Sequence, residues 1–247
     1  MEDSMALFGL VHGACHRAAH WEILSAELQG RGHSVMTVDL PVNDLGATQD
    51  DYLESAVEAF KDATEPVIVV GHSLAGYTTL RLEQRIPVSG LVFLCATIMF
   101  PPGLYPDEPA GPISIPPEDM PVDAQGLINL TFDAARTAFY LDCEPEVTKT
   151  AVEALVPQTA AAVAGPMNRV ERPTAQSIYI QASEDRSVYE TWSTWFAEML
   201  TGRPALRIKG SHSPFLSRPA ELADMLETFA ATLAGAPTTA VAELKMS

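Results

Sequence analysis

The sequence predicts an α/β protein in which a mostly parallel sheet is flanked by helices and interrupted by an inserted helical cap. Two observations indicate the sheet. Short apolar runs rich in β-branched residues recur at wide spacing, and helical patterns lie between them. A third observation indicates the insertion: the alternation stops between Cys95 and Ser177, where 8 of the 19 prolines fall within residues 101–121. Such a stretch cannot supply regular ladder donors.

The apolar runs are typical of buried parallel strands, because each is short and is followed by a turn. They occupy residues 6–11, 34–38, 66–70, 91–95, 177–181 and 205–208. The helical patterns between them cover residues 21–29, 49–61, 74–86 and 188–200. A parallel crossover takes about a dozen residues or more, and most of these gaps allow one.

The long gap is predicted to form a helical cap that is joined to the core by a proline-rich arm. Helical patterns follow the arm at residues 124–140 and 145–155, and an alanine-rich piece continues to Ala164. The alternative is a disordered loop, but the apolar side chains of residues 127–141 favour a packed face. The predicted division is therefore a core of residues 1–96 and 173–236, a cap segment of residues 97–172 and a flexible tail of residues 237–247.

Composition and charge exclude several classes of protein. The chain is 47% hydrophobic and 19% charged, as ordinary globular proteins are. No run approaches the ~20 apolar residues of a membrane span, which excludes an integral membrane protein. The formal net charge of -17 would repel phosphate backbones and anionic lipid surfaces, so we expect neither a nucleic-acid partner nor membrane binding.

The chain start and the cysteines predict a cytoplasmic protein. Residues 1–5 carry acids where a signal peptide needs a basic region. The three cysteines, Cys15, Cys95 and Cys143, cannot all pair within the chain, and each lies in or near an apolar stretch. This pattern is typical of buried thiols in a reducing compartment. The sequence leaves a homodimer open as the oligomeric state.

The strongest local motif is Gly71-His72-Ser73-Leu74-Ala75, which lies between an apolar strand and a helical pattern. A serine on such a sharp turn has its hydroxyl lifted clear of the sheet, and small residues two positions to either side leave room for the turn. The amide of Leu74 would lie at a helix N-terminus, where it can bind an oxyanion. A chance match is the alternative, but the strand-turn-helix context favours Ser73 as a nucleophile.

An acid and a base follow in the chain order that this motif predicts. The strand at residues 177–181 runs into Asp185, at the edge where open α/β sheets bind ligands. The strand at residues 205–208 leads into a loop that contains His212. We predict that His212 is the base and Asp185 the orienting acid, with Glu184 as the rival acid. The alternative for His212 is an ordinary surface histidine.

The first predicted strand ends in a His-Gly turn, which would present the amide of Ala14 as a second oxyanion donor beside that of Leu74. The spacing of His12, His16 and His20 suggests a zinc site. However, the strand and the glycine turn keep His12 off the helix of the other two, and no cysteine or acid completes a ligand set. We therefore predict neither a metal nor another cofactor.

Together these residues resemble the α/β-hydrolase superfamily. The motifs behind the likeness are His12-Gly13-Ala14-Cys15-His16, Asp39-Leu40-Pro41, Gly71-His72-Ser73-Leu74 and Gly210-Ser211-His212-Ser213-Pro214. Within the superfamily, the chain is similar to the branch of plant methylesterases and hydroxynitrile lyases with their bacterial esterase relatives. The likeness covers nearly the whole chain, including Phe139-Tyr140-Leu141-Asp142-Cys143 in the cap segment.

The resemblance implies an α/β-hydrolase fold with Ser73 as nucleophile, His212 as base and Asp185 as orienting acid. The amides of Ala14 and Leu74 would form the oxyanion hole. The implied activity is that of a serine hydrolase, which cleaves a small apolar carboxylic ester or lactone through an acyl-enzyme. The alternatives are a non-hydrolytic enzyme (a cyclase or a lyase) and a ligand-binding receptor on the same fold.

Three positions depart from this branch. Arg17 and Ala19 stand where a glycine and a tryptophan are usual, and we expect both near the mouth of the site. Ser213 stands where the hydroxynitrile lyases carry a lysine that manages cyanide, which disfavours a lyase of that type. The cap segment is expected to supply an apolar lid from Met99, Phe100, Leu104, Phe132, Phe139 and Tyr140.

Overall fold

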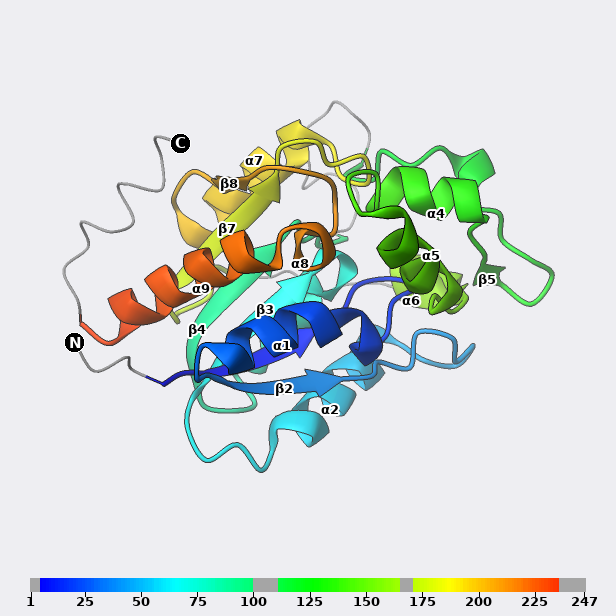
Figure 1. Ribbon diagram of the computed structural model, residues 1–247. Coiled ribbons are helices and arrows are strands. Elements are labelled where there is room, and N and C mark those ends of the chain that lie inside the picture. The colour runs from blue at the N-terminus through cyan, green and yellow to red at the C-terminus, as the bar shows by residue number, and fades with distance from the viewer. Residues whose placement is uncertain (1–4, 100–110, 165–170, 236–247) are drawn as a thin grey trace.

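The centre of the protein is one sheet of six parallel strands (Figure 1). A computed structural model describes residues 5–99, 111–164 and 171–235 of the chain. The strands are β1 (Leu7–Val11), β2 (Ser34–Val38), β3 (Val67–His72), β4 (Val88–Leu94), β7 (Ser177–Ala182) and β8 (Leu206–Ile208). Their order across the sheet is β2-β1-β3-β4-β7-β8, and every neighbouring pair is parallel. The predicted fold class is confirmed.

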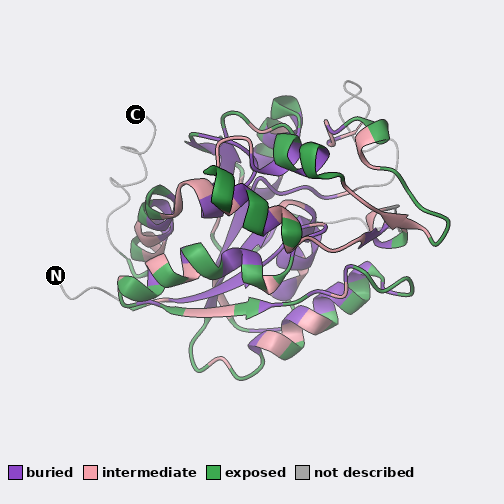
Figure 2. Cartoon of the chain, turned by 45° about the vertical axis from the view of Figure 1, so that its right-hand side comes forward, coloured by how far each residue is buried: buried purple, intermediate pink, exposed green. Residues whose placement is uncertain are grey.

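The inner strands of this sheet are buried on both faces. Along β3, Val67 and Val69 belong to one apolar core, whereas Ile68 and Val70 belong to the core on the opposite face. Successive side chains of a strand point to opposite faces, so a strand that is covered on both sides must be apolar throughout. Figure 2 shows this burial along the inner strands, whereas the edge strand β2 is partly exposed and other exposed residues lie on the outer surfaces of the helices.

Helices cover the two faces of the sheet. Helices α1 (Glu22–Gly30), α8 (Pro214–Ser217) and α9 (Pro219–Leu233) pack with one core, and α2 (Gln49–Phe60), α3 (Gly76–Leu82) and α7 (Glu190–Thr201) pack with the other. The sheet and its helices thus form three layers, as in other α/β proteins.

Helix α9 was not among the predicted elements, although its sequence carries the usual signals. Pro219 occupies the first helical position, and the buried Leu222, Leu226 and Phe229 recur at intervals of three and four residues. The helix lies close to β4, because a Cβ at Gly90 would come within 2.8 Å of the Phe229 ring. A larger residue at this position would require the Phe229 ring to move.

The topology brings the loops after β1 and β3 together. These two strands are neighbours, with Val11 paired with Gly71, although the chain visits β2 between them. The strand order therefore reverses at this point, which is where open α/β sheets form a ligand crevice at the carboxyl ends of their strands. The segments that follow Val11 and His72 both begin at this edge.

The described part of the cap segment lies beyond the carboxyl ends of the strands (Figure 1). Its helices are η3 (Pro117–Asp119), α4 (Phe132–Phe139), α5 (Pro145–Glu153) and α6 (Ala160–Ala164). Two short strands, β5 (Leu127–Ile128) and β6 (Gln158–Thr159), form an antiparallel pair. Residues 101–110 of the predicted arm and residues 237–247 of the predicted tail lie outside the described residues.

The prediction of one helix over residues 124–140 is wrong in its first half. Asp123 Oδ1 accepts hydrogen bonds from the amides of Gln125 and Leu127, which closes a turn ahead of β5. The helix begins only at Phe132, where the Thr131 hydroxyl accepts a hydrogen bond from the Ala134 amide as an N-cap. Asp and Thr side chains compete with helix formation in this way, and an apolar pattern alone does not reveal it.

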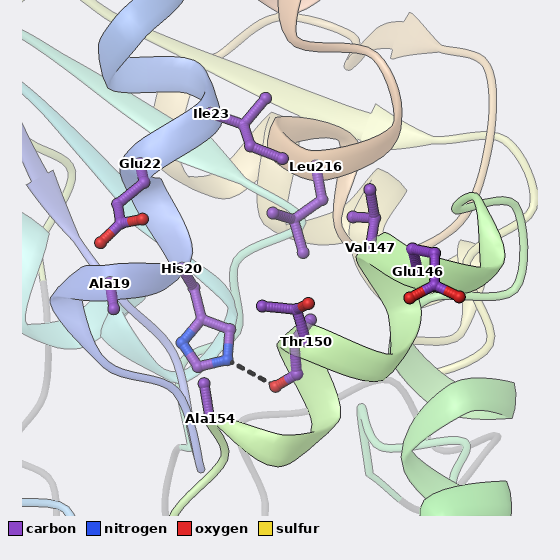
Figure 3. A pocket seen from close by; sticks show the side chains of 10 residues that line it. Ala19, His20, Glu22, Ile23, Glu146, Val147, Thr150, Ala154 and Leu216 are labelled. Atoms are coloured by element: carbon purple, nitrogen blue, oxygen red, sulfur yellow. Dashed lines mark hydrogen bonds between the residues drawn. The ribbon is translucent and has the colours of Figure 1, made fainter.

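Neither Arg17 nor Ala19 is among the described residues that line the cavity beside Ser73. Arg17 pairs with Asp39 at 3.4 Å on the exposed surface. Ala19 belongs to η1 (Ala18–Trp21) and borders a hollow of about 440 Å³, which η1 and α1 share with α5 (Figure 3). The described residues around this hollow include none of Ser73, Asp185 and His212.

None of the described helices is both long enough and apolar enough to cross a bilayer.

Candidate active site

The turn that carries Ser73 is tight and strained. Strand β3 ends at His72, and Ser73 opens the 3-10 turn η2 (Ser73–Ala75), which runs into α3. The φ angle of Ser73 is 52°, a left-handed conformation that non-glycine residues rarely adopt. Strain of this kind is typical of functional sites. The predicted strand-turn-helix context of Ser73 is therefore present.

Two glycines make room for this turn. A Cβ at Gly71 would collide with the Thr79 side chain, and a Cβ at Gly76 would lie 2.6 Å from the carbonyl oxygen of Thr97. The amide of Thr97 in turn donates a hydrogen bond to the carbonyl oxygen of Ser73 at 2.8 Å. The serine backbone is thus held between α3 and the loop that follows β4.

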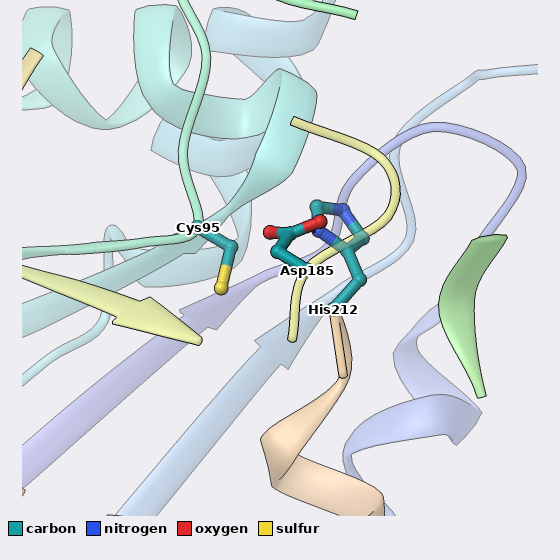
Figure 4. Close-up of side chains that lie close together, drawn as sticks. All are labelled: Cys95, Asp185 and His212. Carbon is teal, nitrogen blue, oxygen red and sulfur yellow. Dashed lines mark hydrogen bonds and ion pairs between the residues drawn. The ribbon is translucent and has the colours of Figure 1, made fainter. Parts of the chain in front are cut away.

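The predicted acid and base are in direct contact (Figure 4). Asp185 follows β7, His212 follows β8, and the distance from Asp185 Oδ2 to His212 Nδ1 is 2.8 Å. The other carboxylate oxygen, Oδ1, accepts hydrogen bonds from the amides of Ser187 at 2.7 Å and Val188 at 3.1 Å. These donors fix the carboxylate, and the carboxylate fixes the tautomer in which His212 Nδ1 carries the proton. Glu184, the rival acid, is exposed.

The second ring nitrogen of His212 is not engaged by any described residue. The His212 side chain is fully buried, and its Nε2 atom has no hydrogen-bond partner within the described part of the chain. His72, the residue before Ser73, donates a hydrogen bond from Nε2 to the carbonyl oxygen of His212 at 3.0 Å. The two imidazole rings lie 4.6 Å apart. The base loop is therefore attached to the turn that carries Ser73.

The loop after β1 lies against the same serine. A Cβ at Gly13 would lie 2.8 Å from the Ser73 Cβ atom, so only glycine allows this contact. His12 holds the turn: Leu40 donates its amide proton to Nε2 at 2.9 Å, which leaves Nδ1 to donate to the Gly13 carbonyl at 2.9 Å. Burial lowers the pKa of His12 to about 4, so the ring stays neutral near pH 7.

The predicted oxyanion donors, the amides of Ala14 and Leu74, belong to residues that line the same cavity as Ser73. The amide of Ala14 has no acceptor in the described ranges of the chain, and Leu74 is the second residue of η2, where an amide has no partner within the turn. The Ala14 carbonyl accepts a hydrogen bond from His16 Nδ1 at 2.7 Å. Cys15 has a φ of 63°, and its amide donates to Gln158 Oε1 at 3.3 Å.

The neighbouring histidines are committed to structural hydrogen bonds. His16 Nε2 accepts from the Tyr140 hydroxyl at 2.8 Å. His20 accepts from the Arg17 amide at Nδ1, at 3.0 Å, and donates from Nε2 to the Ala151 carbonyl, also at 3.0 Å. Both nitrogens of each ring are therefore engaged, which does not fit a zinc ligand set made from these residues.

One other group of described residues has metal-ligand chemistry, and it lies at the site itself. Cys95 shares a buried cluster with Asp185 and His212 (Figure 4). Burial and the nearby Asp185 carboxylate raise the pKa of the Cys95 thiol well above its usual range. The thiol is therefore protonated at neutral pH, and the other two side chains bond to each other. We assign no metal to this cluster.

A cavity of about 120 Å³ opens beside Ser73, between the cap segment and the loop after β1 that contains Gly13, Ala14 and Cys15, the predicted oxyanion loop. Apolar side chains from the cap segment and from the loop after β4 form most of its described wall: Met99, Ile113, Ile115, Met120, Ile128, Leu130, Phe139 and Val163. Of the expected lid residues, Met99 and Phe139 are present. Phe132 is exposed, Tyr140 is buried against His16, and Phe100 and Leu104 lie outside the described residues.

Sequence reasoning missed the side chains that support the site from the cap segment. Gln158 is fully buried and bonds to Cys15 through its oxygen, and its nitrogen donates to the Tyr52 hydroxyl at 2.9 Å. Its partners are more than a hundred residues away in the sequence. No local pattern marks such a residue, although Gln158 belongs to a stretch, Leu155-Val156-Pro157-Gln158, that shares in the predicted likeness to the plant and bacterial branch.

The parallel sheet, the strained serine turn and the acid and base that follow in order define a class of proteins. The model of the alpha/beta hydrolase family matches residues 10–225, from β1 into α9. The chain therefore belongs to the alpha/beta hydrolase family.

Individual relatives agree with the predicted branch. Salicylic acid-binding protein 2 of Nicotiana tabacum is 27% identical over 248 residues, which cover 89% of this chain and 95% of that protein. A pyrethroid hydrolase of Sphingobium wenxiniae is 27% identical over 247 residues, which cover 90% of this chain and 86% of that protein. The predicted likeness to plant methylesterases and to bacterial esterases is confirmed.

Solved structures show the same fold. A pyrethroid hydrolase from Sphingobium faniae has a TM-score of 0.72 at 24% identity and covers 94% of this chain and 100% of its own. A methylesterase from Arabidopsis has a TM-score of 0.70 at 20% identity and covers 92% of this chain and 100% of its own.

Proposed function

We propose that this protein is a serine hydrolase that cleaves a small, uncharged carboxylic ester or lactone. One observation carries the proposal. Asp185 holds His212 by Nδ1, the Nε2 atom of that ring has no hydrogen-bond partner among the described residues, and the His212 carbonyl is bonded to the residue before Ser73. A hydroxyl needs a neighbouring base to become a nucleophile at neutral pH, and this arrangement supplies one.

In the proposed reaction, Ser73 Oγ attacks the carbonyl carbon of the ester while His212 Nε2 takes the hydroxyl proton. Asp185 stabilises the imidazolium that forms and remains ionised itself. The amides of Ala14 and Leu74 bind the oxyanion of the tetrahedral intermediate. His212 then returns the proton to the leaving alcohol, and an acyl group remains on Ser73.

Water completes the cycle by the same steps. His212 takes a proton from a water molecule, the resulting hydroxide attacks the acyl carbon, and the Ser73 oxygen leaves with the proton. A lactone would follow the same route. Because its ester is cyclic, the leaving alcohol stays attached to the acyl group, and hydrolysis gives a single hydroxy acid. The reaction needs no metal or organic cofactor.

The described wall of the cavity supports an apolar substrate of modest size. None of the described residues around it carries a formal charge. A charged substrate would lose its hydration in this cavity without gaining a partner, which is costly. The volume of about 120 Å³ suits a short acyl or alcohol group.

The test is covalent labelling together with turnover. A fluorophosphonate should label one serine, and peptide mapping should find the adduct on Ser73. The same protein should hydrolyse p-nitrophenyl acetate, and Ser73→Ala should lose both properties. Labelling of another serine, or none in folded protein, would defeat the proposal. Ligand binding without ester turnover would favour a receptor, and cyanohydrin cleavage by the wild type would favour a lyase.

A further inference from the structure

A carboxylate from the cap segment lies against the loop that carries His212. Asp142 comes three residues after the end of α4, and its Oδ1 atom accepts a hydrogen bond from the Ser211 amide at 3.0 Å. The hydroxyl of Ser211 also contacts this oxygen. Because Ser211 directly precedes His212, both contacts act on the backbone from which the imidazole projects.

The neighbouring glycine is fitted to this carboxylate. Gly210 has a φ of +107°, and a Cβ at this position would overlap Asp142 Oδ2. Any other residue would therefore push the carboxylate away and strain the backbone. Arg218 places its Nε atom 3.6 Å from Asp142 Oδ2, so the part-buried charge has a counter-ion.

The same end of α4 also bonds to the loop of the acid. The Ser187 hydroxyl donates to the Ala138 carbonyl at 2.8 Å, and the Ser187 amide donates to Asp185. On the base side, the Ser211 hydroxyl lies 3.2 Å from the Phe139 carbonyl. The loop that carries Asp185 and the loop that carries His212 are thus both hydrogen-bonded to the C-terminal end of α4.

We propose that Asp142 is a positioning residue, which holds Ser211 so that the His212 ring stays aimed at both Asp185 and Ser73. Asp142 itself is not among the described residues around the Ser73 cavity, so it acts through the base loop and not on the substrate. This inference rests on the proposed function, since it assigns His212 the role of base.

The first test separates rate from binding. Asp142→Ala should lower kcat for a p-nitrophenyl ester about 100-fold with little change in KM, since a small displacement of a catalytic group can cost that much. Asp142→Asn should recover most of the rate, because its amide oxygen can still accept the Ser211 hydrogen bond. Glu153→Ala removes an exposed acid from the same cap segment and should leave kcat unchanged.

The second test does not depend on ester turnover. The His212 Nδ1 proton, in its hydrogen bond to Asp185, should give a low-field proton resonance in the wild type. This resonance should persist in Asp142→Asn and broaden in Asp142→Ala. An unchanged kcat and a sharp resonance in a folded Asp142→Ala protein would overturn the inference, as would equal rate losses in the Asn and Ala variants.

A milder variant keeps the inference testable if Asp142→Ala does not fold. Ser211→Ala removes the hydroxyl contact with Asp142 but leaves the backbone hydrogen bond, and it should lower kcat and broaden the same resonance. An intact resonance and rate in this variant would also reject the inference. Failure of the wild type to label at Ser73 or to hydrolyse esters would instead defeat the proposed function, whatever the resonance shows.

Discussion

The contact between Asp185 and His212 leads to the first prediction at the scale of single residues. Asp185→Asn should lower kcat by up to about ten-thousand-fold, because the amide no longer holds the imidazole in the correct tautomer. Glu184→Gln should have a mild effect, because Glu184 is exposed and Asp185 makes the contact with the ring. Steady-state kinetics on a p-nitrophenyl ester would measure both. The reverse ranking would move the acid to Glu184.

Gly13 gives a second prediction, which concerns the contact between two loops. A Cβ at this position would lie 2.8 Å from the Ser73 Cβ and 3.0 Å from the His72 carbonyl oxygen. Gly13→Ala should therefore displace the oxyanion loop, lower kcat and destabilise the fold by about 1–3 kcal/mol.

Gly30→Ala is the matched control, because nothing lies within 4 Å of a Cβ there. It should be neutral or slightly stabilising at the end of α1. Urea unfolding and ester kinetics on both variants would decide the matter. An active, fully stable Gly13→Ala protein would show that the two loops are not in close contact.

The residues that could be predicted from the sequence are those that follow strands. Ser73 comes directly after an apolar run, Asp185 and His212 come within a few residues of the end of one, and parallel strands bring such positions to one edge. Gln158 and Asp142 could not be found in this way. Their contacts are with Cys15 and Ser211, which are far away in the sequence, and no local pattern marks such contacts.

At the scale of elements, the N-cap of helix α2 allows a test of how much a local hydrogen-bond motif stabilises the protein. Thr48 accepts hydrogen bonds from the amides of Asp50 and Asp51, and Asp51 Oδ2 accepts from the Thr48 amide at 2.8 Å. Thr48 is exposed, so Thr48→Ala removes the cap and little else. The variant should lose about 1 kcal/mol of unfolding free energy.

Thr48→Ser is the control for this change, since a serine hydroxyl caps a helix as well as a threonine does. Urea titrations of the three proteins should place the Ser variant beside the wild type. If the Ala and Ser variants have the same unfolding free energy, the cap does not stabilise the protein.

Elements with strong local signals in the sequence were predicted, and elements without such signals were not. Helix α2 has both a cap and an apolar face, and its predicted start at Gln49 agrees with the structure. The antiparallel pair of β5 and β6 was not predicted, because two residues in each strand give no periodicity. Those strands form where separate parts of the cap segment meet.

At the scale of the whole molecule, buried neutral histidines predict how stability depends on pH. Burial lowers the pKa of His12, His16, His20 and His72 in the folded protein. In the unfolded chain these rings titrate near the ordinary value of about 6.5. Below that pH the unfolded chain binds protons that the folded protein does not bind. The stability is therefore fully present above pH ~6.5 and is lost as the pH falls toward the folded pKa values, about 4 for His12.

The size of this effect can be measured by urea unfolding between pH 5.5 and 7.5 (roughly one unit on either side of the imidazole value), where carboxylates stay ionised. Each ring that is protonated only on unfolding lowers the unfolding free energy by about 1.4 kcal/mol per pH unit. Four such rings give a slope of up to about 5 kcal/mol per pH unit at the acidic end. A flat profile over this range would contradict the burial of neutral histidines.

The cap segment is inserted between two strands that pair with each other, which affects how relatives with this fold can diversify. The segment leaves the sheet at β4 and returns at β7, and these two strands are paired neighbours. Recombination between relatives could therefore exchange the entire insertion while every strand kept its original partners. A replacement segment that lacks an acceptor for the Ser211 amide would provide a different substrate cavity. On the proposal above, it would also leave the His212 ring out of position. Among chimeras with crossovers at these two strands, those whose incoming segment also has an aspartate at position 142 should be active more often than those whose segment lacks it.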